Sequence, residues 1–287
     1  MLHQLVFTKA SGAGNDFVVI DNMQGLYRHD WSRTAVAFCS RHFGIGADGL
    51  LVLEPSGHTD FTMLYFNADG SYGGMCGNGG RCAARFAYQR GYARETMTFT
   101  AINHAYRARI IGNEVQLVMK DPVQFRDDIL VGREPLLSGV HFLDTGSPHV
   151  VIFRNEIEQA DVEGLGRSLR HAPEFSPEGA NVNVVALRDH GLELRTYERG
   201  VERETLACGT GSVASAITAA RIAGYTSPVH VHVRSGEILR VSFRRDGDRF
   251  TDVCLEGSAR MLFDGACLYD DESGALVAPG AGQPSHA

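Results

Sequence analysis

Two short stretches decide how this chain is organised: Met-Cys-Gly-Asn-Gly at residues 75–79 and Ala-Cys-Gly-Thr-Gly at residues 207–211. Both follow one pattern, in which an apolar residue and a cysteine precede a glycine, a hydrogen-bonding residue and a second glycine. Each is followed by small residues that predict a helix beginning just after the cysteine. The cysteines, Cys76 and Cys208, lie 132 positions apart, and the pattern indicates an internal duplication.

The spacing of 132 residues recurs at two further places. It joins the glycine-polar turn at residues 14–15 to the one at 146–147, and an apolar strand follows each turn. It also joins residues 66–67 to residues 198–199, where a predicted strand ends in both halves. We therefore predict two copies of one unit. The predicted bounds are 1–132 for the copy with Cys76, 133–264 for the copy with Cys208, and 265–287 for a last strand and a disordered tail.

Most of the remaining sequence has the pattern of short strands. Runs rich in β-branched and aromatic residues predict strands at residues 61–66, 96–101, 106–111, 114–120, 149–153, 182–187, 192–198, 229–233, 237–244 and 250–255. Helical patterns are fewer and cover residues 31–42, 78–90 and 210–223. These patterns predict an α+β fold of two pseudo-symmetric repeats, each a curved, mostly antiparallel sheet wrapped around a central helix.

The composition narrows the class of function. The 287-residue chain is 44% hydrophobic and can build a core, and its net charge of −7 without a basic cluster argues against nucleic-acid and membrane partners. No apolar stretch approaches the roughly 20 residues of a membrane span, and the N-terminus has no signal-peptide pattern. The six cysteines have no metal-ligand spacing. We expect a cytoplasmic protein that acts on a small molecule and binds no metal.

The positions of Cys76 and Cys208 favour proton-transfer chemistry. The N-terminus of a helix stabilises a thiolate through its N–H groups and dipole, and the same N–H groups can hold a carboxylate. Asn78 and Thr210, two residues after each cysteine, are favourable N-cap types. One such cysteine could equally be a small buried residue at a turn, whereas two in equivalent places suit a base and an acid on opposite faces of one carbon. The other cysteines lack this context and are expected in the core: Cys39, Cys82, Cys254 and Cys267.

Several segments match a known family: residues 7–17, 44–48, 66–71, 75–82, 146–149, 177–181, 197–200 and 207–211. On these segments the chain resembles the diaminopimelate epimerase family along nearly its whole length. The family interconverts LL- and meso-diaminopimelate, a step in the synthesis of lysine and cell-wall precursors, without pyridoxal phosphate. The resemblance implies an isomerase that needs no cofactor and forms a homodimer, with diaminopimelate as its small-molecule substrate.

The resemblance also implies roles for residues at the matching positions. Cys76 and Cys208 would alternate as base and acid, while His149 and Glu198 would assist proton transfer at the reacting carbon and Glu198 would also bind the substrate. The α-carboxylate would lie on the backbone N–H groups of Gly77, Asn78, Gly209 and Thr210. A distal amino-acid head group needs a cation for its carboxylate and oxygen atoms for its ammonium. The residues that would bind it are Asn15, Asn67, Asn181 and Arg199.

Two positions depart from the common family pattern. Ser147 stands where many members have asparagine, so this predicted site residue has a shorter reach and a weaker or water-mediated contact. Gly49 stands where many members have glutamine, and it has no side chain to offer. The offset of 132 makes Gly49 the counterpart of Asn181, so one symmetric polar contact is lost. Neither departure touches the two cysteines.

Two other functions are compatible with paired cysteines. A proline or hydroxyproline racemase would also use two of them, but proline has no distal head group for Asn15, Asn67, Asn181 and Arg199 to bind. A non-catalytic amino-acid-binding or redox protein would use the cysteines as a reversible disulfide, and it would show thiol titration without turnover. The polar set favours the epimerase.

Overall fold

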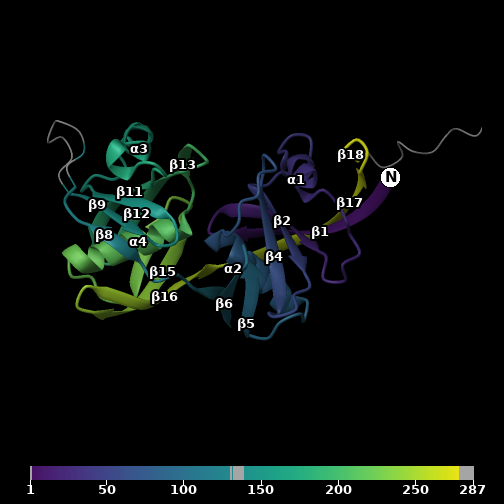
Figure 1. The fold of residues 1–287 in the computed structure, drawn as a ribbon, viewed down its shortest axis with the longest axis horizontal. Coiled ribbons are helices and arrows are strands. Elements are labelled where there is room, and N and C mark those ends of the chain that lie inside the picture. The colour runs from purple at the N-terminus through teal and green to yellow at the C-terminus, as the bar shows by residue number, and fades with distance from the viewer. Residues whose placement is uncertain (1, 130, 132–138, 278–287) are drawn as a thin grey trace, which may run out of the picture. The chain divides into compact units, whose positions relative to one another are not determined.

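The computed structural model describes residues 2–129, 131 and 139–277. The chain packs as two compact units, one of Met1–Val115 with Ala259–Ala287 and the other of Gln116–Ser258. Both units contain many strands and few helices (Figure 1). The repeat border expected at residues 132–133 and the end of the expected tail, residues 278–287, lie outside the described residues. No helix in the described part of the chain is long and apolar enough to cross a membrane.

The first unit is built mainly from strands around one central helix. Its elements are β1 (Leu2–Gly12), β2 (Asn15–Asp21), α1 (Trp31–Cys39), β3 (Gly49–Glu54), β4 (Phe61–Asn67), α2 (Gly77–Gln89), β5 (Thr96–Ala101), β6 (His104–Ile111), the beginning of β7 (Glu114–Val118), β17 (Arg260–Asp270) and β18 (Ala275–Val277). The pairs β2–β3 and β4–β5 are parallel. The pairs β1–β2, β1–β17, β3–β4, β5–β6 and β17–β18 are antiparallel.

The second unit has the same plan around another helix. Its elements are β8 (Val123–Arg126), β9 (Val140–Asp144), β10 (Pro148–Phe153), α3 (Val162–Arg170), the 3-10 helix Pro173–Phe175, β11 (Asn181–Arg188), β12 (Gly191–Glu198), β13 (Arg203–Thr205), α4 (Gly209–Ile222), β14 (Val229–Val233), β15 (Ile238–Asp246) and β16 (Arg249–Ser258). The pairs β10–β11 and β12–β14 are parallel. The pairs β9–β10, β11–β12, β12–β13, β14–β15 and β15–β16 are antiparallel.

The duplication is visible in the registers of the strands. Phe17 pairs with Gly49 in β2–β3, and His149 pairs with Asn181 in β10–β11, which is the same register 132 residues later. The helices α2 and α4 occupy equivalent places in the order of elements. The structure therefore confirms the α+β class with two repeats of mostly antiparallel sheet around a central helix.

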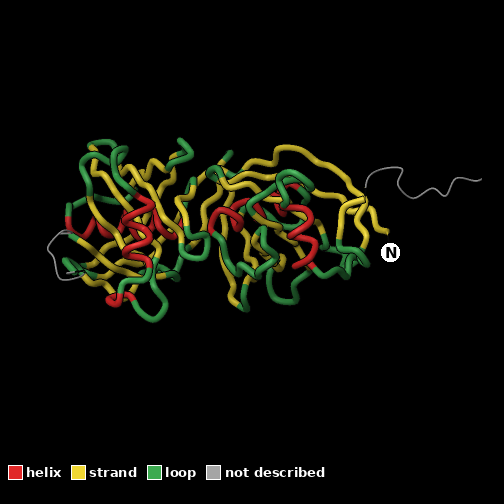
Figure 2. Tube along the Cα trace, turned by 90° about the horizontal axis from the view of Figure 1, so that it is seen from above, coloured by secondary structure: helices red, strands yellow, loops and turns green. Residues whose placement is uncertain are grey.

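Burial explains why the central helices are rich in small residues. Every residue of α4 from Gly211 to Ala220 is buried. Its buried hydroxyl groups, on Ser212, Ser215 and Thr218, donate to the backbone oxygen four residues earlier at 2.7–2.8 Å. Because each hydroxyl is satisfied within the helix, these polar residues can be buried. The helices lie among the strands of their units in Figure 2, with helices red and strands yellow.

The sequence did not predict α3, and it extended α1 too far. Two glycines in Val162–Arg170 lower its intrinsic helix propensity. The helix forms because tertiary packing outweighs propensity: an added Cβ at Gly166 would lie 2.2 Å from Cγ of Tyr197, so the glycine permits close approach to β12. Helix α1 ends at Cys39 because the carbonyl oxygens of Phe38 and Cys39 accept N–H groups from residues 45–47. The long strand β1 was also not predicted.

Candidate functional site

Cys76 and Cys208 are themselves the N-caps of the two central helices, which corrects the expectation that Asn78 and Thr210 would cap them. Both cysteines have extended backbones, with φ −118° and ψ 124° at Cys76 and φ −121° and ψ 114° at Cys208. The Cys76 sulfur accepts the N–H of Gly79 at 3.4 Å. Backbone N–H groups in the first turn of a helix have no carbonyl acceptor inside it, and they form an anion-binding terminus. Each cysteine therefore lies at such a terminus.

In the first unit, a chain of side-chain amides orients two predicted site residues, Asn78 and Asn15. Arg81, which is fully buried, donates to Oδ1 of Asn78 at 2.9 Å. Nδ2 of Asn78 donates to Oδ1 of Asn15 at 2.5 Å, and Nδ2 of Asn15 donates to Asp48 at 3.0 Å. Because arginine is only a donor and carboxylate only an acceptor, the direction of every bond in the chain is determined. The structure thus links Asn15 to the first turn of α2.

A charged network that was not predicted from the sequence supports this chain. The Lys9 ammonium is buried, lies 2.7 Å from Asp16 and also contacts the carbonyl oxygen of Gly46. Arg41 bridges Asp16 and Asp48, at 2.8 Å from each. Burial raises the pKa of Asp16, but hydrogen bonds from Arg41 and Lys9 outweigh it and hold that pKa below its ordinary value. Lys9 and Asp16 thus hold the turn that carries Asn15.

In the second unit, the side chain of Asn181 links two other predicted site residues, Ser147 and Arg199. Its Nδ2 donates to Oγ of Ser147 at 3.1 Å and to the carbonyl oxygen of Pro148 at 3.1 Å. Its Oδ1 accepts the backbone N–H of Arg199 at 2.9 Å. The guanidinium of Arg199 is half-buried and lies 3.8 Å from the carboxylate of Glu178. Asn181 therefore ties the start of β10 to the turn after β12.

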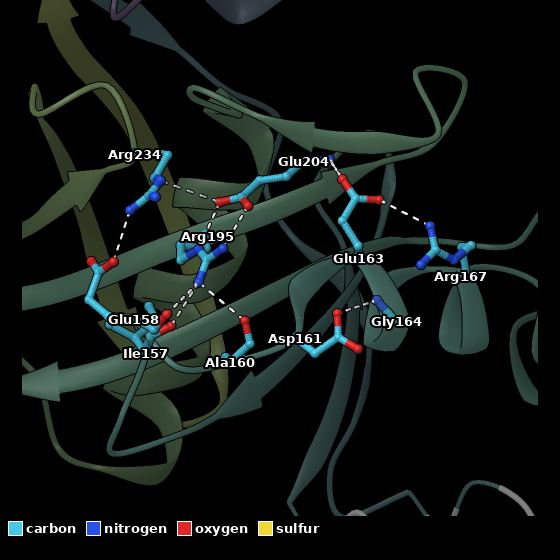
Figure 3. A network of polar contacts seen from close by, with 10 residues as sticks. All are labelled: Ile157, Glu158, Ala160, Asp161, Glu163, Gly164, Arg167, Arg195, Glu204 and Arg234. Atoms are coloured by element: carbon cyan, nitrogen blue, oxygen red, sulfur yellow. Dashed lines mark hydrogen bonds and ion pairs between the residues drawn. The ribbon is translucent and has the colours of Figure 1, made fainter.

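Glu198, the last residue of β12, accepts a hydrogen bond from Thr205 at 2.6 Å. An ion pair earlier on the same strand holds β12 and β13 together. Arg195 binds Glu204 of β13 through two bonds of 2.7 Å, and its Nη1 donates to the backbone oxygens of Ile157, Glu158 and Ala160 (Figure 3). Both side chains of the pair are mostly buried. This network fixes the strand that ends in Glu198, and it was not predicted from the sequence.

His149 is fully buried, and its tautomer follows from its neighbours. Nδ2 of Asn183 donates to the carbonyl oxygen of Val150 at 2.9 Å and lies 3.1 Å from Nδ1 of His149. Because the carbonyl oxygen of Val150 can only accept, the amide cannot be reversed, and its Oδ1 accepts from the hydroxyl of Thr196 at 3.0 Å. Nδ1 is therefore an acceptor, and the proton of the neutral ring lies on Nε2. Within the described residues, Nε2 has no hydrogen-bond partner.

Burial, together with a smaller contribution from the positive charge of Arg199, lowers the pKa of His149 to about 3. The ring is therefore neutral at pH 7. It acts as a hydrogen-bond donor through Nε2–H rather than as an imidazolium acid. A buried donor without a protein partner is costly unless a ligand completes it. This is the arrangement expected of a group that binds substrate.

The lowered pKa of His149 predicts how stability depends on pH. The unfolded chain takes up a proton on this histidine below about pH 6.5, whereas the folded protein does so only near pH 3. The contribution of His149 to the free energy of unfolding therefore falls as pH decreases through this range. In His149→Gln we expect the free energy of unfolding, measured with urea, to decrease less steeply between about pH 7 and about pH 4. Exposed His104→Gln is the control, and equal slopes in wild type and His149→Gln would contradict the assignment.

The second glycine of the Cys208 motif makes room for Asn183. A Cβ at Gly211 would lie 2.4 Å from Oδ1 of Asn183, so only glycine lets this amide lie against the first turn of α4. Nearby, the Cys208 sulfur lies 3.6 Å from the hydroxyl of Thr210. The geometry therefore links His149, through Asn183, to the helix terminus that carries Cys208.

Cys39 and Cys82 are buried, as expected of core residues, whereas Cys254 and Cys267 are only partly buried, which corrects that expectation for these two. Burial raises the pKa of Cys39 and Cys82 to about 12 and that of Cys267 to about 11. These three thiols are therefore protonated at pH 7. Among residues 2–129, 131 and 139–277, no group of three or more His, Cys, Asp or Glu could hold a metal ion.

Comparison with known sequences identifies the family. The family model for diaminopimelate epimerase matches residues 7–125 and 141–262. The chain is 47% identical over 262 residues to a diaminopimelate epimerase of Chlorobaculum tepidum, covering 89% of this chain and 98% of that one. The chain belongs to the diaminopimelate epimerase family. Another member, from Aquifex aeolicus, is 39% identical over 90% of this chain and 96% of its own length.

Solved structures with low sequence identity share the fold of this diaminopimelate epimerase family member. A phenazine biosynthesis protein of the PhzF family from Bacillus anthracis matches with a TM-score of 0.71 at 15% identity, covering 92% of this chain and 99% of that one. A hydroxyproline epimerase from Agrobacterium vitis matches with a TM-score of 0.68 at 12% identity and covers 94% of each chain. The same fold therefore occurs in proteins that are only 12% and 15% identical to this chain.

Proposed function

We propose that the protein is a cofactor-independent epimerase that interconverts LL- and meso-2,6-diaminopimelate by proton transfer between Cys76 and Cys208. The observation that carries the proposal is that each cysteine is the N-cap of a buried central helix in one of two equivalent repeats. Membership of the diaminopimelate epimerase family supports the choice of substrate.

The chemistry requires one thiolate and one thiol. The thiolate removes the α-hydrogen as a proton, and the electron pair stays on the α-carbon, conjugated with the carboxylate. The thiol then protonates the opposite face, so the configuration inverts and the two cysteines exchange protonation states. The reverse reaction uses the same groups in opposite roles. The N–H groups of Gly77, Asn78, Gly209 and Thr210 would hold the α-carboxylate and stabilise the charge that it gains.

Neutral His149 would donate from Nε2–H to a substrate oxygen, which completes its buried hydrogen-bonding capacity. Glu198 would accept from the α-ammonium group. At the distal end of the substrate, Arg199 suits the carboxylate. The side chains of Asn15, Asn67, Ser147 and Asn181 would supply the remaining hydrogen bonds.

We also propose the cellular setting that the family resemblance implies. The enzyme would act in the cytoplasm, in the synthesis of lysine and peptidoglycan precursors, and it would be a homodimer. Its partner in catalysis would be the small-molecule substrate alone, without nucleic acid or membrane. Proline and hydroxyproline are less suitable substrates, since neither has a distal amino-acid head group.

The proposed function is tested by incubating the protein with LL-diaminopimelate and, in parallel, with L-proline, without added pyridoxal phosphate. Chromatographic separation of the stereoisomers follows both reactions. We expect LL-diaminopimelate to become a mixture with the meso form, while proline keeps its configuration. Racemisation of proline alone, or no change in either substrate, would contradict the proposal.

A further inference from the structure

The missing side chain at Gly49 is replaced in space by the ring of Tyr65. A Cβ at Gly49 would lie 2.5 Å from Cε2 of Tyr65, and a Cβ at Gly73 would lie 2.3 Å from Cε1 on the other edge of the ring. Real side chains cannot approach so closely, so Tyr65 occupies a slot between two glycines. Gly49 is also the strand partner of Asn67 in β3–β4, and Gly73 N–H donates to the carbonyl oxygen of Tyr65 at 2.9 Å.

The hydroxyl of Tyr65 reaches Asn67, a predicted site residue. It donates to Oδ1 of Asn67 at 2.8 Å. Nδ2 of Asn67 donates to Oγ of Ser71 at 2.9 Å, and that hydroxyl donates to the Asp69 carboxylate at 2.6 Å. Because the Asp69 carboxylate can only accept, it determines the direction of each bond back to Tyr65. The amide oxygen of Asn67 is therefore turned toward Tyr65.

Tyr65 also lies close to the first turn of α2. Its ring meets Phe17 edge to face, with the centroids 6.1 Å apart. A Cβ at Gly79, in that first turn, would lie 3.6 Å from the Phe17 ring and 3.5 Å from Cβ of Cys76. The ring of Phe17 therefore contacts both Tyr65 and the helix terminus that carries Cys76.

We propose that Tyr65 is a positioning residue that takes over the place of a side chain at position 49 and orients Asn67 as a hydrogen-bond donor for the substrate. This inference rests on the proposed function. With its oxygen engaged by Tyr65 and one Nδ2 hydrogen engaged by Ser71, the Asn67 amide has its second Nδ2 hydrogen to offer. The free N–H suits a carboxylate oxygen, whereas the amide oxygen, which would otherwise face an ammonium group, already accepts from Tyr65. Tyr65 thereby favours ligands with a distal carboxylate.

The first test compares Tyr65→Phe with Tyr92→Phe. Both variants lose a hydroxyl-to-oxygen hydrogen bond in the first unit, because Tyr92 donates to Asp21 at 2.6 Å. Loss of one such hydrogen bond corresponds to a change in affinity of about five- to tenfold. We expect Tyr65→Phe to raise KM for diaminopimelate by that factor with kcat within about twofold, and Tyr92→Phe to leave both constants unchanged. An unchanged KM in Tyr65→Phe would overturn the inference.

A second test measures selectivity without relying on turnover. Lysine is diaminopimelate without the distal carboxylate, so the ratio of their dissociation constants reports on that end of the ligand. Calorimetry should show weaker binding of meso-diaminopimelate in Tyr65→Phe and unchanged binding of lysine, and equal weakening of both would contradict the inference. If wild type binds diaminopimelate without epimerising it, the proposed function fails while this comparison still tests Tyr65.

Thermal unfolding tests whether the ring of Tyr65 fills the space between Gly49 and Gly73. Gly73→Ala should lower the melting temperature in the wild-type background, because the new methyl group collides with the Tyr65 ring. The same change should cost little in a Tyr65→Ala background, where the ring is absent. Additive effects of the two substitutions would show that Tyr65 does not fill the space between the glycines.

Discussion

Replacing Cys76 or Cys208 by serine is expected to lower kcat for epimerisation by about 10²- to 10⁴-fold, with a much smaller change in KM. Serine is nearly the same size as cysteine, but its hydroxyl is a far weaker acid and does not supply an oxyanion base at pH 7. Each variant therefore keeps the helix terminus and loses one of the two proton-transfer groups. Stereoisomer separation of the LL- and meso forms over time measures the rate.

Cys267→Ser is the matched control for these variants. Its thiol is partly exposed, and burial raises its pKa to about 11, so it is not a thiolate at pH 7. We expect this variant to turn over at the wild-type rate. A Cys76→Ser or Cys208→Ser enzyme with wild-type kcat would rule out the two-cysteine mechanism.

Replacing Asn183 by aspartate is expected to lower kcat by about 10- to 100-fold, through His149 rather than through any contact of its own with substrate. A carboxylate beside Nδ1 attracts a proton to that nitrogen, and the pKa of His149 rises. The neutral ring then has its proton on Nδ1, and Nε2 ceases to be a donor. Nitrogen-15 NMR of the imidazole distinguishes the tautomers directly. In addition, kcat of the variant should vary with pH as His149 titrates, a dependence that wild type lacks.

Thr196→Val and Asn183→Ala complete this test. Thr196→Val removes the bond to Oδ1 of Asn183 but keeps the bond to His149, so it should lower stability and leave the tautomer unchanged. Asn183→Ala avoids burying a carboxylate and should give a mixture of tautomers. If His149 keeps its proton on Nε2 alone in both Asn183 variants, Asn183 does not position it.

The parts of the fold that could be predicted depend on local pattern. The small-residue helices after Cys76 and Cys208 are predicted within one residue, and the common offset identifies the repeat. Helix α3 depends on packing between Gly166 and Tyr197, which are distant in sequence, so its local pattern is too weak to predict it. The caps lie two residues earlier than expected, and at Cys76 the sulfur itself accepts a backbone N–H.

In the site, too, features set by local sequence could be predicted and features set by tertiary contacts could not. The cysteines follow from motif and duplication, and the identity of the substrate-binding residues follows from family resemblance. The tautomer of His149 depends on Asn183, 34 positions away, and the direction of the Asn67 amide depends on Tyr65 and Asp69 together. Such hydrogen-bond directions arise from tertiary contacts. The ring of Tyr65 fills the space at Gly49, and this substitution of one side chain by another is a tertiary contact that no local pattern predicts.

The central claim is that one cysteine removes the substrate hydrogen and a different cysteine supplies the new one. The most direct measurement is the initial reaction of protiated LL-diaminopimelate in D₂O, with the deuterium content of substrate and product determined by mass spectrometry. Thiols exchange with solvent, so the account predicts that each meso product molecule carries one deuterium while the remaining LL substrate stays protiated. Meso product that retains the original hydrogen would instead show a single base acting on both faces, and it would contradict the account.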